Sequence, residues 1–90
     1  MVDVYLVAWI VSGSRRTAIL KALEHPMSPC QVHKKSKDYS PKISLNHTSD
    51  TLRELQKQGL ATCITPENTR GRIYQLTPIG EELRKELMKG

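Results

Sequence analysis

Apolar side chains recur at helical spacing in the first third of the chain. Between residues 15 and 24 they form one face of a predicted helix: Ala18, Ile19, Ala22 and Leu23. Ser14 is expected to cap this helix, and Pro26 ends it, because the residue before a proline avoids the helical backbone region. The apolar run 4–11, inside the N-terminal segment 1–13, fits a leading turn of this helix, a separate short helix or a strand.

The next helix begins with a full set of start signals. Ser28 stands at the N-cap position, a proline follows at the first helical position, and Gln31 lies three residues after the cap. This is the pattern of a capping box, and Met27 and Val32 are placed as its hydrophobic staple. The pattern predicts a helix that ends near residue 35 or 36, before a polar loop that contains a proline.

The longest periodic stretch lies between residues 44 and 58. Ser44 is its predicted N-cap, and an apolar stripe marks its predicted buried face: Leu45, Thr48, Leu52 and Leu55. Gly59 follows at a position that suits left-handed backbone, where Leu60 folds back on Leu55 as in a Schellman motif.

Two short apolar runs, 60–66 and 72–76, are separated by ENTRG and predict a hairpin with its glycine at Gly71. A last helix is expected over 77–90, with acidic residues early and lysines late. The order of elements predicts one domain over residues 1–90 of class α+β, mainly α. Helices joined through a loop and followed by a hairpin make a helix-turn-helix with a wing.

Composition adds a positive charge to this picture. The chain has 90 residues, 14 Lys+Arg against 9 Asp+Glu and a net charge of +5, which indicates a nucleic acid or another acidic surface as partner. With only Cys30 and Cys63, the chain is no disulfide scaffold, and a reduced, cytoplasmic protein is expected. The run 4–11 is too short to span a membrane and lacks the positive flank of a signal peptide.

Four motifs, in their order and spacing, resemble winged-helix transcription regulators of the MarR and ArsR kind, most of all small archaeal members: RRTAILKAL, SPCQVHKKS, ISLNHTSDTLRELQKQGL and TPENTRGRIYQLTPIGEEL. The resemblance spans residues 15–87 and implies a winged helix-turn-helix, with a three-helix core, a two-stranded wing and a C-terminal helix. It implies that helix 44–58 enters the major groove of double-stranded DNA and that wing 66–72 contacts the adjacent backbone or minor groove. It also implies a homodimer through the N-terminal segment and the C-terminal helix.

The chain departs from the family in two places. The turn at 37–43 is longer by several residues than the tight turn usual there, which affects how the third helix docks. Asp50 stands where relatives often carry an arginine or another polar residue. Asp50 has three interpretations: it pairs with Arg53 or Lys57, it orients Arg53, or it accepts from cytosine N4. The first is favoured.

The polar face of helix 44–58 supplies the first candidates for DNA contacts: Ser44, Asn46, His47, Asp50, Arg53 and Lys57. Asparagine matches adenine and arginine matches guanine in the major groove, whereas the alternative is an ordinary solvated helix face. Thr69, Arg70 and Arg72 are the candidates in the wing, because a narrow minor groove attracts arginine. Lys34, Lys35 and Lys42 surround the long turn and suit phosphate positioning, with a solvated basic loop as the alternative.

Other chemistry finds little support in the sequence. Cys30 and His33 stand three residues apart, but the last helix has no further metal ligand, so no metal site is expected. No catalytic constellation or cofactor motif is found, and the chain is expected not to be an enzyme. The predicted function is a DNA-binding transcription regulator, and the alternative is a winged-helix adaptor that binds other proteins.

An apolar group lies outside the predicted core: Tyr5, Leu6, Trp9 and Ile10. It suits a dimer interface against the last helix of a partner, at Ile79, Leu83 and Leu87. Packing within the same chain is an equally good interpretation.

Overall fold

The computed structural model describes residues 3–67 and 71–89, which form five helices and a two-stranded antiparallel sheet. The elements follow in this order: α1 (Val4–Val11), α2 (Ser14–Ala22), α3 (Pro29–Ser36), α4 (Leu45–Lys57), β1 (Ala61–Cys63), β2 (Tyr74–Leu76) and α5 (Pro78–Met88). The fold is therefore α+β and mainly helical, as predicted. The layout is compatible with a winged helix.

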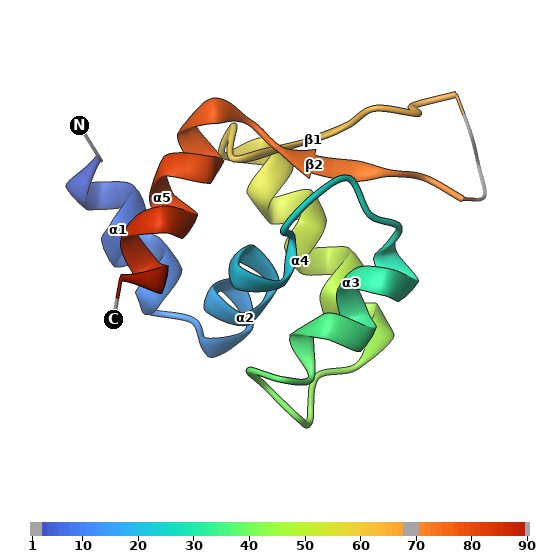
Figure 1. Ribbon diagram of the computed structural model, residues 1–90, viewed down its shortest axis with the longest axis horizontal. Helices are drawn as coiled ribbons and strands as arrows, with labels where there is room; N and C mark the ends of the chain where they lie inside the picture. Colours follow the sequence, from blue (N-terminus) through green and yellow to red (C-terminus); the bar gives the residue numbers. More distant parts are fainter. Residues whose placement is uncertain (1–2, 68–70, 90) are drawn as a thin grey trace.

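The hydrophobic core lies between α2, α3 and α4, which contact one another pairwise. The hairpin β1–β2 extends away from the helices, and α1 and α5 lie at the other end of the molecule (Figure 1). Several core side chains have no exposed surface at all: Ile10, Ile19, Leu20, Val32, Leu52, Leu55 and Leu60. Each of the five helices contributes at least one buried side chain to this cluster, so one core serves the whole described chain.

The apolar run at the N-terminus is a separate helix, which settles the alternatives left open by its sequence. Asp3 caps α1, because its carboxylate accepts the N–H of Tyr5 at 2.9 Å. Ile10 faces the core, but Val4 and Tyr5 are 76% and 86% exposed. The helix is apolar on nearly every side and is covered on only one.

The start of α2 differs from the prediction that Ser14 is its cap. Gly13 is the N-cap residue and Ser14 is the first helical residue, with no side-chain hydrogen bond at the cap. The short connection from α1 sets this start, because the hydroxyl of Thr17 donates to the carbonyls of both Ile10 and Gly13. The helix ends at Ala22, two residues earlier than expected, where the chain turns toward the sheet.

The capping box at the start of α3 is confirmed. The Ser28 hydroxyl accepts the N–H of Gln31, and the Gln31 side chain accepts the N–H of Ser28. At the other end, His33 Nε2 donates to the carbonyl of Ile43 at 2.9 Å. This hydrogen bond ties α3 directly to the residue before the N-cap of α4. The long turn at 37–43 is thus anchored at both ends, and Ile43 is buried in the core.

The ends of α4 are as predicted, and so are three of the four residues of its buried face: Thr48, Leu52 and Leu55. Ser44 accepts the N–H of His47, and Gly59 at φ +74° completes a Schellman motif in which the Leu60 N–H donates to the Leu55 carbonyl. Leu45, however, is 41% exposed, and Thr51 is buried in its place. Because α4 packs against α2 as well as α3, its contact face is turned toward the Thr51 side.

The predicted strands are shorter than their apolar runs. Ladder pairing continues only to the Ile64 N–H and Ile73 carbonyl, after which the Thr65 hydroxyl accepts the Ile73 N–H. Met27, just before α3, exchanges two backbone hydrogen bonds of 2.8 and 2.9 Å with Tyr74. That bridge joins the α2–α3 connection to the hairpin, a contact with no signal in the sequence.

The start of α5 lies against the end of α4. The Thr77 hydroxyl accepts the N–H of Gly80 and donates to the carbonyl of Gly59 at 2.6 Å. Gly80 is buried, and a Cβ there would overlap the carbonyl oxygen of Leu60. Further along, Arg84 Nε donates to the Lys21 carbonyl and holds α5 against α2.

Candidate nucleic-acid interface

The outer face of α4 presents most of its predicted contact residues to solvent. Asn46, Arg53 and Lys57 are exposed, whereas His47 is half-buried and faces α2. The Ser44 hydroxyl is occupied as the helix cap at 3.1 Å from the His47 N. The outer face of α4 is therefore bordered by two clefts, one on each side of the helix.

Asp50 pairs with Arg53, as the favoured interpretation of the sequence has it. One carboxylate oxygen of Asp50 lies 3.6 Å from Nη1 of Arg53, and both side chains are 69% exposed. Such a pair on a solvated helix surface contributes only about 0.2–0.5 kcal/mol. The pair is therefore easily opened, and Arg53 is free to exchange it for an anion on a partner.

The first flank of α4 brings two predicted arginines to one place. A cleft of about 280 Å³ is lined by Pro29, Ser49, Arg53, Arg72 and Tyr74, and is called the Arg53–Arg72 cleft below. Its walls come from the first turn of α3, the middle of α4 and the returning half of the hairpin. Three segments that are far apart in the sequence meet there, two of them with a guanidinium group.

The tip of the hairpin is described only in part. Thr69 and Arg70, both predicted wing contacts, lie outside the described residues, as does Asn68. Gly71 has φ +67°, a backbone conformation that side chains rarely adopt, so glycine is needed where the hairpin returns. Arg72 follows it and is exposed.

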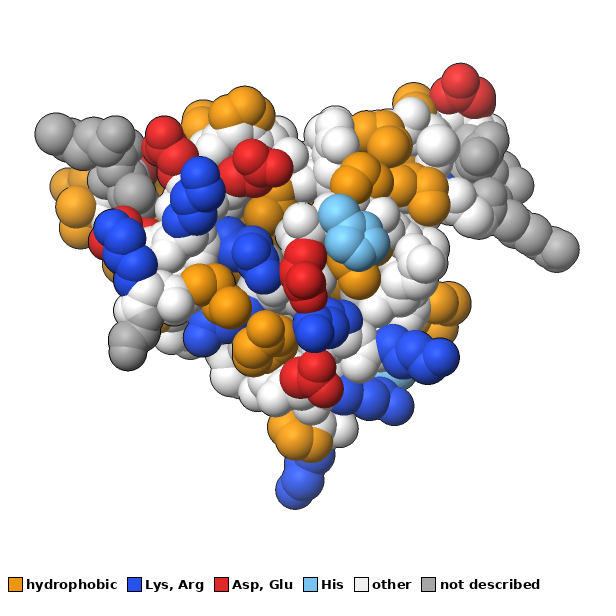
Figure 2. Space-filling view, in the orientation of Figure 1, with side chains coloured by type: hydrophobic (Ala, Val, Ile, Leu, Met, Phe, Trp, Pro, Cys, Tyr) orange, Lys and Arg blue, Asp and Glu red, His pale blue; other side chains and the backbone are white. Residues whose placement is uncertain are grey.

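The lysines around the long turn differ in their surroundings. Lys35 lies 3.3 Å from Glu24 and 3.5 Å from Asp38, and the hydrogen bond to Glu24 is the main reason that the pKa of Lys35 is raised. Lys34 and Lys42 are exposed. Basic side chains gather at the lower right of the face in Figure 2, whereas acidic and basic groups interleave at its centre.

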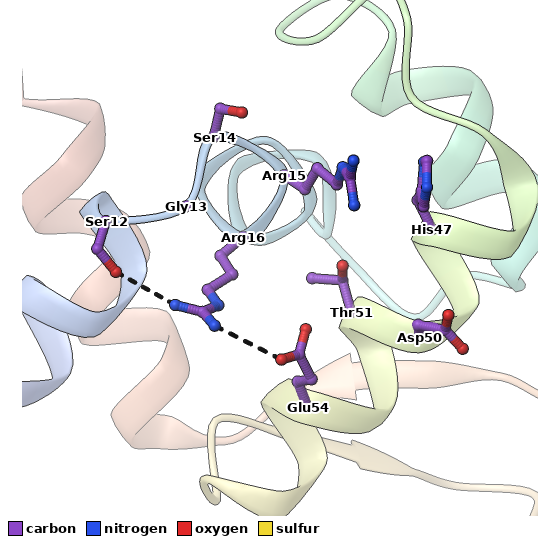
Figure 3. A pocket seen from close by; sticks show the side chains of 9 residues that line it. All are labelled: Ser12, Gly13, Ser14, Arg15, Arg16, His47, Asp50, Thr51 and Glu54. Carbon is purple, nitrogen blue, oxygen red and sulfur yellow. Dashed lines mark hydrogen bonds and ion pairs between the residues drawn. The ribbon is translucent and has the colours of Figure 1, made fainter.

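The second flank of α4 forms a larger cleft that sequence reasoning missed. It has a volume of about 660 Å³ and lies between the start of α2 and α4; we call it the α2–α4 cleft. The residues that line it are shown in Figure 3: Ser12, Gly13, Ser14, Arg15, Arg16, His47, Asp50, Thr51 and Glu54. Nothing in the periodicity of α4 indicates that its polar face is shared between two clefts.

Arg16 holds one wall of the α2–α4 cleft together. Its guanidinium lies 4.3 Å from the ring centroid of Trp9, donates to the Trp9 carbonyl at 2.9 Å and pairs with Glu54 at 3.6 Å. The positive charge that opposes the dipole of α2 is thereby satisfied within the chain, through contacts with α1 and α4.

Neither a metal cluster nor a membrane span is found in the described part of the chain. His33 is engaged with Ile43, Cys30 is exposed, and no group of three or more histidine, cysteine or acidic side chains there suits a metal ion. No described helix has the length and apolar character needed to cross a bilayer.

Protein-family models, curated proteins and solved structures give no match to this chain.

Proposed function

We propose that the chain is a winged helix-turn-helix regulator that binds double-stranded DNA, with α2, α3 and α4 as its three-helix core and β1–β2 as its wing. The observation that carries this proposal is the Arg53–Arg72 cleft, where the first turn of α3, the middle of α4 and the returning half of the hairpin meet. Helix α4 enters the major groove, and the arginines contact bases and the adjacent backbone.

The dimensions of α4 suit this role. Its 13 residues span about 20 Å at 1.5 Å per residue, and a helix about 10–12 Å wide fits a major groove about 12 Å wide. Asn46, Arg53 and Lys57 are exposed along the part that would enter. Phosphate contacts from lysines and the hairpin would position the helix, and base contacts from α4 would give specificity.

The Met27–Tyr74 bridge supports a rigid interface. It fixes the base of the hairpin to the segment that leads into α3. The backbone at Tyr74 is therefore fixed relative to α3 without help from DNA, which reduces the ordering cost of binding.

Binding of Arg53→Ala and Arg72→Ala variants tests the proposal. Arg72→Ala is expected to weaken binding to every sequence and to lower the slope of log K against log[salt] by about 0.9, because one phosphate is no longer neutralised. Arg53→Ala is expected to cost about 1–3 kcal/mol and to relax preference at one base position. Titration with DNA selected from a random pool, at several salt concentrations, measures both effects.

Lys85→Ala is the matched control, because Lys85 is exposed on α5 and lies outside both clefts. The proposal fails if both arginine variants bind like the control, or if the wild-type protein shows no binding to mixed DNA below about 10 μM at low salt.

A homodimer through α1 is part of the proposal. Val4, Tyr5 and Val11 are 76%, 86% and 55% exposed on a helix that is apolar nearly all round, and such helices are usually buried. Ile79 of α5 is also exposed, at 55%. Ile10 and Leu83, by contrast, are buried in their own chain and are not available to a partner.

Tyr5→Asp is expected to weaken this dimer at least about 30-fold, the effect of removing a hot-spot residue worth about 2 kcal/mol. Because Tyr5 is 86% exposed, the monomer fold is not disturbed. Sedimentation equilibrium measures the dimer constant, with Ile64→Asp on the hairpin as a control that leaves it unchanged. A wild-type protein that stays monomeric from the lowest to the highest measurable concentration rules the dimer out.

The exposed apolar side of α1 also favours a second candidate function. If this second function is correct, the domain is an adaptor in a larger assembly, and the exposed apolar side of α1 contacts a different protein. The DNA titration separates the two, since an adaptor without DNA contacts shows no salt-dependent binding.

A further inference from the structure

The ion pairs described above do not neutralise every charged side chain that lines the α2–α4 cleft. Two carboxylates line it, but Glu54 is paired with Arg16 and Asp50 with Arg53, each at 3.6 Å. In Figure 3 the Asp50 carboxylate points away from α2, whereas the Arg15 side chain reaches across the cleft toward the His47 ring. Arg15 has no hydrogen-bond or ion-pair partner among residues 3–67 and 71–89. A positive charge is thus left uncompensated in the cleft.

His47 on the opposite wall is an incompletely satisfied polar group. Its Nδ1 atom is shielded from solvent and has no hydrogen-bond partner in the described structure. A buried N–H without an acceptor is costly, so this surrounding favours the tautomer that carries its proton on Nε2. His47 then offers an N–H donor from Nε2, next to the guanidinium of Arg15.

Backbone donors add to these two side chains. Gly13 caps α2 without a side chain, so no side-chain oxygen takes up the N–H groups of the first turn of the helix. That turn begins at Ser14 and forms one wall of the same cleft. Uncapped N–H groups and the positive end of the helix dipole both favour an anion.

We propose that the α2–α4 cleft binds a phosphate group between Arg15, His47 and the first turn of α2. This inference rests on the proposed function for the source of the phosphate, which is the DNA backbone. The two clefts lie on opposite flanks of α4, since Ser49 and Arg53 line one and His47 and Glu54 line the other. A helix in the major groove has a phosphate backbone on each side, so the second cleft meets the strand that the hairpin does not.

Titration with inorganic phosphate tests the site without DNA. Followed by ¹H–¹⁵N NMR, the wild-type protein is expected to show saturable shifts at the Arg15 side-chain N–H, the His47 ring and the backbone amides of residues 14–16. Arg15→Gln removes these shifts, Arg15→Lys retains part of them, and Lys85→Gln keeps them all. Shifts that are absent, or that persist unchanged in Arg15→Gln, overturn the site. Arg15 has no intramolecular partner in the described structure, so its variants are expected to fold.

Salt-dependent DNA binding tests the source of the phosphate. Arg15→Gln is expected to lower the slope of log K against log[salt] by about 0.9, and Lys85→Gln to leave it unchanged. A positive phosphate titration with an unchanged slope keeps the site but assigns it to a free phosphate ester and overturns the backbone contact. If the wild-type protein binds no DNA, the proposed function fails, and the phosphate titration still decides whether the cleft is an anion site.

Discussion

Gly80→Ala is expected to lower the free energy of unfolding by about 3 kcal/mol. A Cβ at this position would overlap the Leu60 carbonyl oxygen and lie 3.0 Å from its carbonyl carbon, so α5 must move away from the end of α4. The expected sign is the reverse of the usual one, because glycine to alanine inside a helix normally stabilises by about 1 kcal/mol. For a domain of this size the midpoint of thermal unfolding should fall by roughly 12–24 °C.

The effect depends on the backbone contact and not on helix propensity. Glu82→Ala, on an exposed position two residues later in α5, is the matched control and should change stability by less than about 0.5 kcal/mol. Calorimetry of the two variants decides the matter. An alanine at position 80 that leaves the midpoint unchanged or raises it would show that α5 does not approach Leu60 so closely.

Leu52→Ala is expected to cost about 3 kcal/mol, within the range for a fully buried leucine that leaves a cavity. Leu52 has no exposed surface and lies in the middle of α4, on the face that packs against the other core helices. This is a large part of the stability of a small domain, which is about 5–15 kcal/mol. The midpoint of urea unfolding measures it, with an unchanged slope as evidence that only stability has changed.

Leu45→Ala is the control on the same helix. The sequence pattern gives Leu45 and Leu52 the same role, whereas the structure leaves Leu45 41% exposed. Its replacement should cost less than about 0.5 kcal/mol. Equal destabilisation by the two variants would contradict the packing face of α4 described above.

Local signals explain why the helix ends and the element order could be predicted. The capping box at Ser28, the cap at Ser44 and the glycine stop at Gly59 each depend on residues within a few positions, and each is present in the structure. The N-cap of α2 lies one residue before the predicted one, because it depends on the hydrogen bond from Thr17 to the Ile10 carbonyl of α1, across a chain connection.

Contacts between distant segments could not be predicted in this way. Thr51 is buried and Leu45 exposed because α4 packs against two helices at once, and periodicity alone does not give the direction of the second. Charge pairing has the same limit: the pattern of α4 suggested the pair of Asp50 with Arg53, one helical turn apart, but not that of Glu54 with Arg16. The pair of Glu54 with Arg16 lies in the wall of the α2–α4 cleft, so the sequence pattern does not predict this cleft.

The sequence makes Arg53 and Arg72 candidate DNA contacts, but it does not indicate that the two line one cleft. Lys35, a candidate for phosphate positioning, is paired with Glu24 and Asp38, which its position in the sequence does not indicate. A basic residue next to a loop looks the same in a sequence whether its charge is compensated or not.

The hydrogen bond from His33 to Ile43 joins α3 directly to the start of α4. The turn between the two helices is also held along its path, because the N–H groups of Tyr39 and Ser40 both donate to the Ser36 carbonyl and Lys21 lies over the Tyr39 ring. The greater length of this turn is therefore taken up by ordered backbone and not by slack chain. A reporter group inserted here is expected to leave the docking of α4 unchanged only if these hydrogen bonds are kept.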